Sequence, residues 1–158
     1  MNLSLCREDG LYEAGDTLTV KWRISRVPLD QVQGLEVSVM WHTEGKGDED
    51  LHVHHFHRVV ESQIRRAGLA DDQSITCVLP LTPLSYHGRL ISVRWCTRMR
   101  LFLANGKEIV AEQPFHLISP GLSPIGGFEP YSGEVASSDS ADDFELVDSP
   151  VGESSPIS

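Results

Sequence analysis

Apolar and polar side chains alternate along several stretches of this chain, which is the pattern of half-buried β-strands. The longest such stretch begins after Gly88 and runs to about Leu103. Its apolar face is predicted to point into a core and consists of Ile91, Val93, Trp95, Thr97, Met99, Leu101 and Leu103. Its other face is predicted to point outward and consists of Arg94, Cys96, Arg98 and Arg100. Such alternation is typical of an antiparallel sheet with one solvated face.

Shorter alternating stretches predict further strands over residues 17–26, 35–41, 51–60, 74–79 and 108–117. In the first two, the residues predicted to point inward are Leu18, Val20, Trp22, Ile24, Leu35, Val37, Val39 and Trp41. The Asn105-Gly106 pair predicts a type I′ hairpin turn. Residues 63–72 are polar, and we expect a loop with at most one helical turn there. Seven or eight short strands without a convincing helix predict an all-β fold, an immunoglobulin-like antiparallel β-sandwich.

The composition changes after residue 118. Residues 119–158 hold eight of the chain's 23 acidic residues and none of its 13 basic ones, so most of the net charge of −10 lies there. Pro, Gly and Ser dominate this segment, which cannot bury enough apolar surface to offset its conformational entropy. We therefore expect a sandwich domain over residues 1–118 and a disordered acidic tail over residues 119–158.

Charge and cysteine content narrow the class of protein. The acidic balance repels phosphates, which argues against nucleic-acid binding. No apolar run is long enough to span a bilayer, and the first residues lack the basic and apolar regions of a signal peptide. Cys6, Cys77 and Cys96 are odd in number and form no C-x-x-C motif, which favours buried, reduced thiols. We expect a cytoplasmic protein without a cofactor.

Four histidines at residues 52–57 are the one cluster that suggests metal chemistry. On a regular strand, His52 and His54 project to one face, and His55 and His57 project to the other. Two imidazoles at this spacing can bind one metal ion, so a small His-dependent metal-binding β protein, with or without enzymatic activity, is the alternative interpretation. No carboxylate or further histidine stands at a spacing that would complete the site. Polar positions on an edge strand are the simpler explanation.

The sequence offers little for catalysis. Ser85 lies in no G-x-S-x-G motif, and the cysteines lie in apolar strand contexts that favour inert thiols. The adjacent carboxylates of Asp71 and Asp72 are typical of a solvated loop rather than of acid–base chemistry. We expect that the chain is not an enzyme.

The acidic tail contains a short apolar motif. Phe144, Leu146 and Val147 are embedded in aspartate and glutamate, which is the usual composition of a docking segment. One hypothesis is that this motif docks on the domain along a sheet edge, or beside the outward arginines Arg94, Arg98 and Arg100. The alternative is a solubilising tail above a solvated strand face.

Three motifs follow one another along residues 12–88. Tyr12-x-x-Gly15-Asp16 leads into an early strand, residues 35–47 form a strand with a Gly-rich turn, and Leu79-Pro80 precedes Pro83-x-Ser85-Tyr86-x-Gly88 and a long alternating strand. In this order, the three motifs resemble those of the arrestin superfamily, so residues 1–118 resemble one of its sandwich domains. The chain is about half as long as a full arrestin, so a groove between two domains is not implied.

The resemblance implies a non-catalytic function. Arrestins bind protein partners, and they tuck a C-terminal tail onto their own domain. Together with the apolar motif of the tail, this predicts a protein-interaction module, an adaptor or scaffold whose sheet edge or loops bind a protein partner. The identity of the partner does not follow from the residues.

Overall fold

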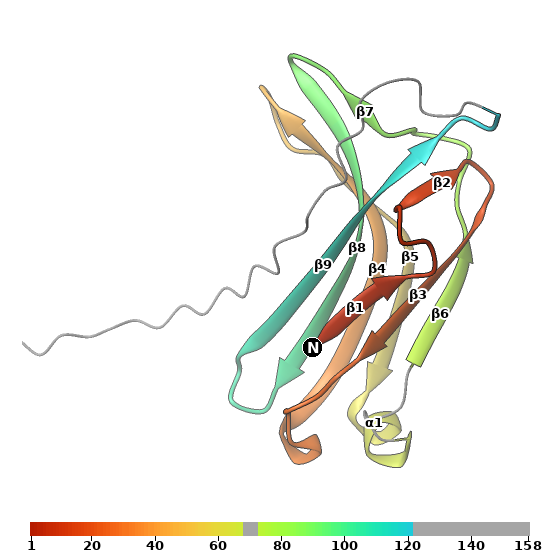
Figure 1. The fold of residues 1–158 in the computed structure, drawn as a ribbon. Coiled ribbons are helices and arrows are strands. Elements are labelled where there is room, and N and C mark those ends of the chain that lie inside the picture. The colour runs from red at the N-terminus through yellow and green to blue at the C-terminus, as the bar shows by residue number, and fades with distance from the viewer. Residues whose placement is uncertain (68–72, 122–158) are drawn as a thin grey trace, which may run out of the picture.

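The computed structural model describes residues 1–67 and 73–121 (Figure 1). This part of the chain is built mainly from strands. In chain order, its elements are β1 (Asn2–Leu5), β2 (Leu11–Glu13), β3 (Thr17–Arg23), a 3₁₀ turn (Leu29–Gln31), β4 (Val32–Gly45), β5 (Leu51–Val60), α1 (Glu61–Ala67), β6 (Gln73–Val78), β7 (Tyr86–His87), β8 (Ile91–Leu103) and β9 (Glu108–Ile118).

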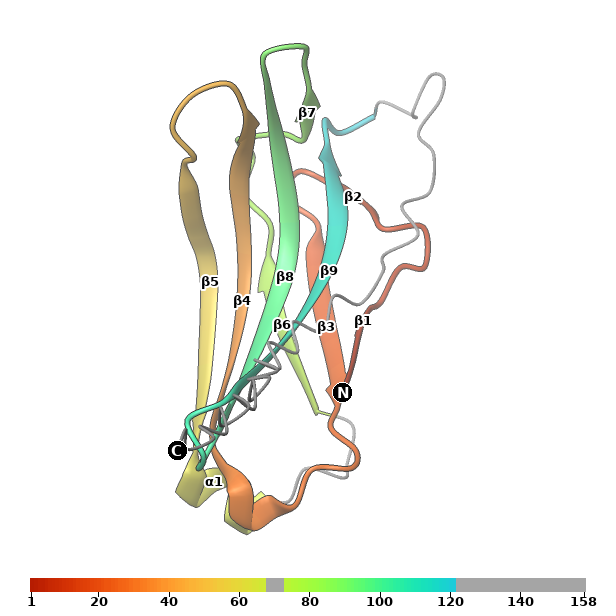
Figure 2. The same ribbon diagram turned by 90° about the vertical axis from the view of Figure 1, so that its left-hand side faces the viewer.

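The strands form two sheets that pack face to face (Figures 1 and 2). The smaller sheet has the order β1-β3-β6, and the larger has the order β2-β9-β8-β4-β5, with β7 paired to one end of β8. Among the described strands, neighbours are antiparallel except β2 and β9, which run parallel. The predicted fold class, an all-β sandwich, is confirmed.

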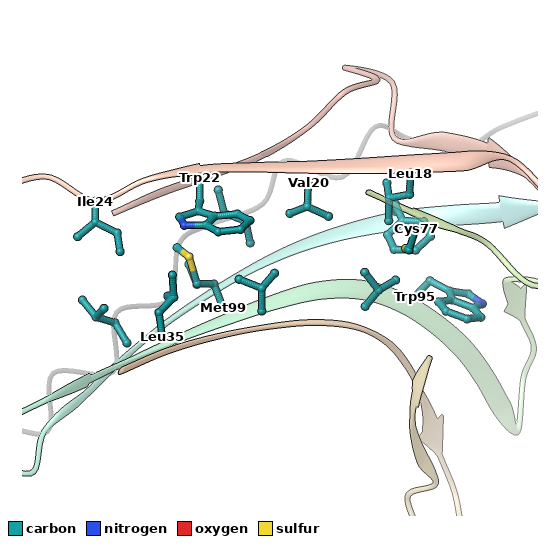
Figure 3. Packing of buried hydrophobic residues seen from close by; sticks show 14 of the residues in the cluster. Leu18, Val20, Trp22, Ile24, Leu35, Cys77, Trp95 and Met99 are labelled. Atoms are coloured by element: carbon teal, nitrogen blue, oxygen red, sulfur yellow. The ribbon is translucent and has the colours of Figure 1, made fainter. Parts of the chain in front are cut away.

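The core lies between the two sheets and contains most of the residues predicted to point inward. Leu18, Val20 and Trp22 point from β3 toward the larger sheet, where Met99 and Leu35 face them (Figure 3). The register of β4 against β8 places the inward residues of the two strands side by side, since Leu35 lies opposite Leu101 and Val37 opposite Met99. Buried apolar area of this kind is the dominant stabilising term in folding.

Two details of the long strand differ from its pattern. Ile91 occupies an inward-facing position, yet it is 44% exposed. The ends of β4 and β8 extend past the smaller sheet, which therefore cannot cover that position (Figure 2). Cys96 faces outward as predicted, yet it is only 3% exposed. In the register of the sheet it lies between Met40 of β4 and Pro114 of β9.

The turn and helix predictions are corrected by the backbone. Gly106 has a φ of +79°, but Asn105 is not among the described residues with positive φ, so the hairpin cannot be type I′. Instead, the Gly106 amide donates a hydrogen bond to the Leu103 carbonyl, and the Leu103 amide donates one to the Lys107 carbonyl. This is a type I turn closed by a left-handed glycine. Residues 61–67 form the helix α1, where only a helical turn was expected.

Residues 122–158 lie outside the described part of the chain. They include Phe144, Leu146 and Val147, so the docking of these residues and the domain boundary at residue 118 stay predictions. In the described part, no helix is long and apolar enough to cross a membrane.

Candidate functional site

β5 forms one edge of the larger sheet. It pairs antiparallel with β4, and no other described strand lies along its far side (Figure 2). A ten-residue edge strand presents a row of backbone N–H and C=O groups to solvent. Such an edge can pair with another extended chain.

Apolar side chains stand on the outward face of this edge. Val53 lies opposite Met40 and Phe56 lies opposite Ser38, both of which point away from the core. Phe56 is 52% exposed and Val53 is 42% exposed. Edge strands usually carry charges or prolines that discourage pairing. On β5, the outward face carries apolar groups and Arg58 instead.

A β-bulge interrupts the pairing of β5 with β4. The register passes from the pair Val39–His55 to the pair Met40–Val53, so His54 is the extra residue. A bulge leaves one residue unpaired and increases the local twist. Because of the inserted residue, odd-numbered side chains point outward before the bulge, and even-numbered side chains point outward after it.

The bulge corrects the prediction for the histidines. His52 lies opposite Trp41, His55 opposite Val39 and His57 opposite Val37. All three partners belong to the core-facing side of β4, so His55 and His57 share a face with His52. The sequence predicted opposite faces because it assumed an unbroken period of two.

His54 links the two sheets. Its Nε2 atom lies 2.8 Å from the carbonyl oxygen of Val78, at the end of β6 in the smaller sheet. Because a carbonyl can only accept, this imidazole nitrogen is the donor. The ring also meets Trp95 edge to face, with a centroid distance of 6.1 Å. His54 therefore connects the larger sheet to the smaller sheet beside the exposed edge.

The metal-binding alternative gains no support from this arrangement. Over residues 1–67 and 73–121, no three His, Cys, Asp or Glu side chains are grouped so that they could hold a metal ion. His54 donates to a backbone carbonyl, and His52 stacks on Trp41 at a centroid distance of 5.9 Å. These contacts give the histidines structural partners.

The arginines predicted as a docking stripe do lie together on the outward face of β8, but each has an acidic neighbour. Arg94 Nε lies 2.8 Å from Glu44 Oε2, and Arg98 pairs with Glu112. Arg100 binds Glu108 in a bidentate pair, with distances of 2.6 and 2.9 Å, and lies 3.8 Å from Glu36.

The ion pairs change the electrostatics of this face. The Arg100 guanidinium, which donates hydrogen bonds to Glu108, holds the pKa of that carboxyl below its usual range. The pKa of Arg100 is raised by the same contact. The acidic partners come from both neighbouring strands, β4 and β9, so positive and negative charges balance along this stripe. We call Arg94, Arg98 and Arg100 with their partners the arginine ladder. It offers less attraction to an acidic segment than three unpaired arginines would.

The cysteines are not alike. Burial, together with the charge of Glu112, raises the pKa of the Cys96 thiol to about 12, which makes it a poor nucleophile. Burial also raises the pKa of Cys77. Cys6 is exposed, which corrects the prediction that all three thiols are buried. Its sulfur lies 3.3 Å from the Tyr12 hydroxyl.

Sequence reasoning missed the exposed apolar residues of β5. The strand was expected at residues 51–60, and it is confirmed there. The missed signal was a change of phase, because Leu51 and Val53 are odd-numbered whereas Phe56 and Val60 are even-numbered. Such a change within a strand indicates a bulge.

Comparison with known proteins assigns neither a family nor a function to this chain. No protein-family model and no curated protein sequence matches the chain. Among solved structures, it is similar to the crystal structure of Spo0M, a sporulation control protein from Bacillus subtilis, with 13% sequence identity and a TM-score of 0.46. The match covers 73% of this chain and 47% of that one, so the chain spans about half the length of that structure. This likeness is too low to assign a family or a function.

Proposed function

We propose that this protein is a non-catalytic interaction module that binds an extended segment of a protein partner along β5, by strand addition. The observation that carries this is the open ten-residue edge with Phe56 and Val53 exposed on its outward face. Backbone hydrogen bonds would supply affinity, and the alternate side chains would supply specificity.

The composition of β5 indicates the chemistry of the partner. The strand contains four histidines and Arg58 but no acidic residue. Pairing of β5 with a second copy of itself would bring no acidic side chain opposite Arg58, so charge complementarity would not favour it. A segment that alternates acidic and large apolar residues is complementary to the edge on both faces.

The chain carries one such segment in its tail. In an antiparallel register that places Phe144 beside Phe56, Asp142 stands beside Arg58. On the other face, Asp143 stands beside His57, and Glu145 stands beside His55. Leu146 then reaches the bulge near Val53. The tail can therefore act as an internal competitor for the partner.

The edge is a better site for the tail than the arginine ladder. Arg58 at the edge and the three arginines of the ladder all have carboxylate partners, since Arg58 lies 3.5 Å from Glu36, so charge does not separate the two sites. The edge offers in addition the open row of backbone groups that strand addition requires. The linker of about twenty residues after Gly121 can span at most roughly 70 Å when extended. The distance across the sheet from β9 to β5 is about 15 Å, at about 4.8 Å per strand.

The arrestin resemblance supports the same class of function. A two-sheet sandwich over the described residues agrees with a single arrestin-like domain. The adaptor or scaffold role and the cytoplasmic location rest on the sequence argument.

The test is binding of a labelled peptide of residues 137–150 to residues 1–121, with and without the substitution Phe56→Asp. We expect an affinity near millimolar for the parent protein, because exposed ion pairs contribute only about 0–1 kcal/mol each. Phe56→Asp should abolish the binding. Leu81→Asp is the matched control, because Leu81 is 70% exposed and belongs to the loop after β6 rather than to β5. Equal loss in both variants would refute the edge as the site.

A further inference from the structure

Two histidines of β5, His55 and His57, have no side-chain partner in the part of the chain that the structure describes. His52 stacks on a tryptophan, and His54 donates a hydrogen bond to a backbone carbonyl. For His55 and His57, no side-chain hydrogen bond, ion pair or ring contact with another described residue exists. Both rings can therefore contact a bound segment without giving up an existing contact.

The two imidazoles stand on one face of the strand, beside its open edge. His55 lies opposite Val39 and His57 lies opposite Val37, on the core-facing side of β4. The two valines are buried, whereas His57 is exposed, so the smaller sheet covers β4 more fully than it covers the edge strand. A strand added along the edge of β5 would place alternate side chains beside these two rings.

The described elements around the two rings supply no carboxylate for them. Their neighbours on β4 are valines, and β6 carries no ionisable side chain except the buried thiol of Cys77. On β5 itself, Arg58 points to the other face, where it lies 3.5 Å from Glu36. The charged residues of α1, the helix that follows β5, are Glu61, Arg65 and Arg66, of which the first two form an ion pair. A carboxylate for these rings would therefore come from a bound segment.

The charge of the rings depends on pH, and that of the carboxylates does not. Histidine changes its charge between pH 5 and 8, and a protonated imidazole attracts a carboxylate. Aspartate and glutamate stay ionised over the same range. A bound acidic segment favours the protonated rings, so binding takes up protons. The affinity therefore rises as pH falls through this range.

We infer that capture of an acidic segment at β5 is switched by pH, with His55 and His57 as the proton-binding groups. The inference rests on the proposed function, since it concerns the same edge, and it adds selection of two carboxylates and release toward pH 8. In the register given above, the tail offers Asp143 beside His57 and Glu145 beside His55. His54 can donate from Nε2 in both protonation states of its ring, so the contact between the sheets is kept.

The experiment is an amide NMR titration of the full chain with the peptide of residues 137–150 at pH 5.5 and pH 7.5. In the protein, Phe144, Leu146 and Val147 are replaced by serine, so that its own tail does not compete with the peptide. We expect the peptide to bind about fivefold more tightly at pH 5.5, which is the factor given by two exposed ion pairs of about 0.5 kcal/mol each.

Two matched changes assign the effect to the two rings. A peptide with Asp143→Asn and Glu145→Gln leaves the protein untouched, and its affinity should be the same at both pH values. In the protein, His55→Asn combined with His57→Asn should remove the pH effect for the parent peptide and leave the affinity at pH 7.5 unchanged. His87→Asn is the control and should keep the pH effect, because His87 is an exposed histidine of β7.

Two results would overturn the inference. One is an equal affinity of the parent peptide at both pH values, and the other is a pH effect that survives the two asparagine substitutions. Both results leave β5 as the binding site, because the peptide still shifts its amide signals. The absence of shifts in β5 at either pH would instead overturn the proposed function itself, and the inference with it.

Discussion

His54 of β5 donates from Nε2 to the carbonyl of Val78 at 2.8 Å, so the bulged residue of the exposed edge is also the residue that ties the two sheets together. The bulge makes this contact available by turning His54 toward β6. The edge can therefore stay open for pairing while its position relative to the smaller sheet is fixed.

This relationship predicts the effect of removing the imidazole. His54→Ala should lower the free energy of unfolding by about 1–2 kcal/mol, because a hydrogen bond and the ring contact with Trp95 are both lost. His57→Ala, at an exposed position on the same strand, should change it by less than about 0.5 kcal/mol. Urea denaturation of both variants is the measurement. Equal effects would mean that the contact with Val78 carries no stability.

Gly45 ends β4 at a point where the chain leaves no room for a side chain. Its φ is +144°, and a Cβ there would collide with the backbone oxygen of Leu90. Gly47 has a similar φ of +133° but open space around it. Gly45→Ala should cost more than about 2 kcal/mol, and Gly47→Ala about 1 kcal/mol, since only the first adds a collision to the backbone strain. Thermal unfolding of the two variants tests this. Similar losses of stability in both would show that the Leu90 oxygen leaves room for a side chain at Gly45.

The pair between Arg100 and Glu108 makes part of the stability depend on pH. The Arg100 hydrogen bonds depress the pKa of Glu108 in the folded state, so the stabilisation is present above the unfolded value near 4.5 and is lost as pH falls through the folded value. Glu108→Gln should therefore cost under about 1 kcal/mol at pH 7. The difference from the parent protein should shrink steadily below pH 4.5. A difference that stays constant down to pH 3 would contradict the pairing.

The strands that could be predicted from the sequence are those with one apolar and one polar face. Leu18, Val20 and Trp22 alternate with polar residues without interruption, so the inward face could be predicted. The partners of the arginines could not, because the pairing of Glu108 with Arg100 depends on the register between β8 and β9. On β5, the single residue inserted at His54 reversed the phase, and Phe56 was therefore overlooked.

Removal of residues 122–158 should leave the sandwich intact. The described core draws on no residue after Ile118, since its last buried member is Leu117. We expect the midpoint of thermal unfolding of residues 1–121 to lie within about 2 °C of that of the full chain, below the shift that a 1 kcal/mol change produces. Calorimetry of both proteins is the test. Loss of cooperative unfolding after truncation would show that the tail belongs to the domain.

The central claim is that β5 accepts an extended acidic and apolar segment, and amide NMR of residues 1–121 titrated with the peptide of residues 137–150 tests it most directly. The predicted result at low salt is a set of saturable shifts in β5, including Phe56 and Arg58, with slower amide exchange along its outer edge. At about 1 M salt, where the screening length falls to about 3 Å, the shifts should weaken but persist, because the apolar contacts remain. Shifts confined to the arginine ladder of β8, or no shifts at low salt, would contradict the claim.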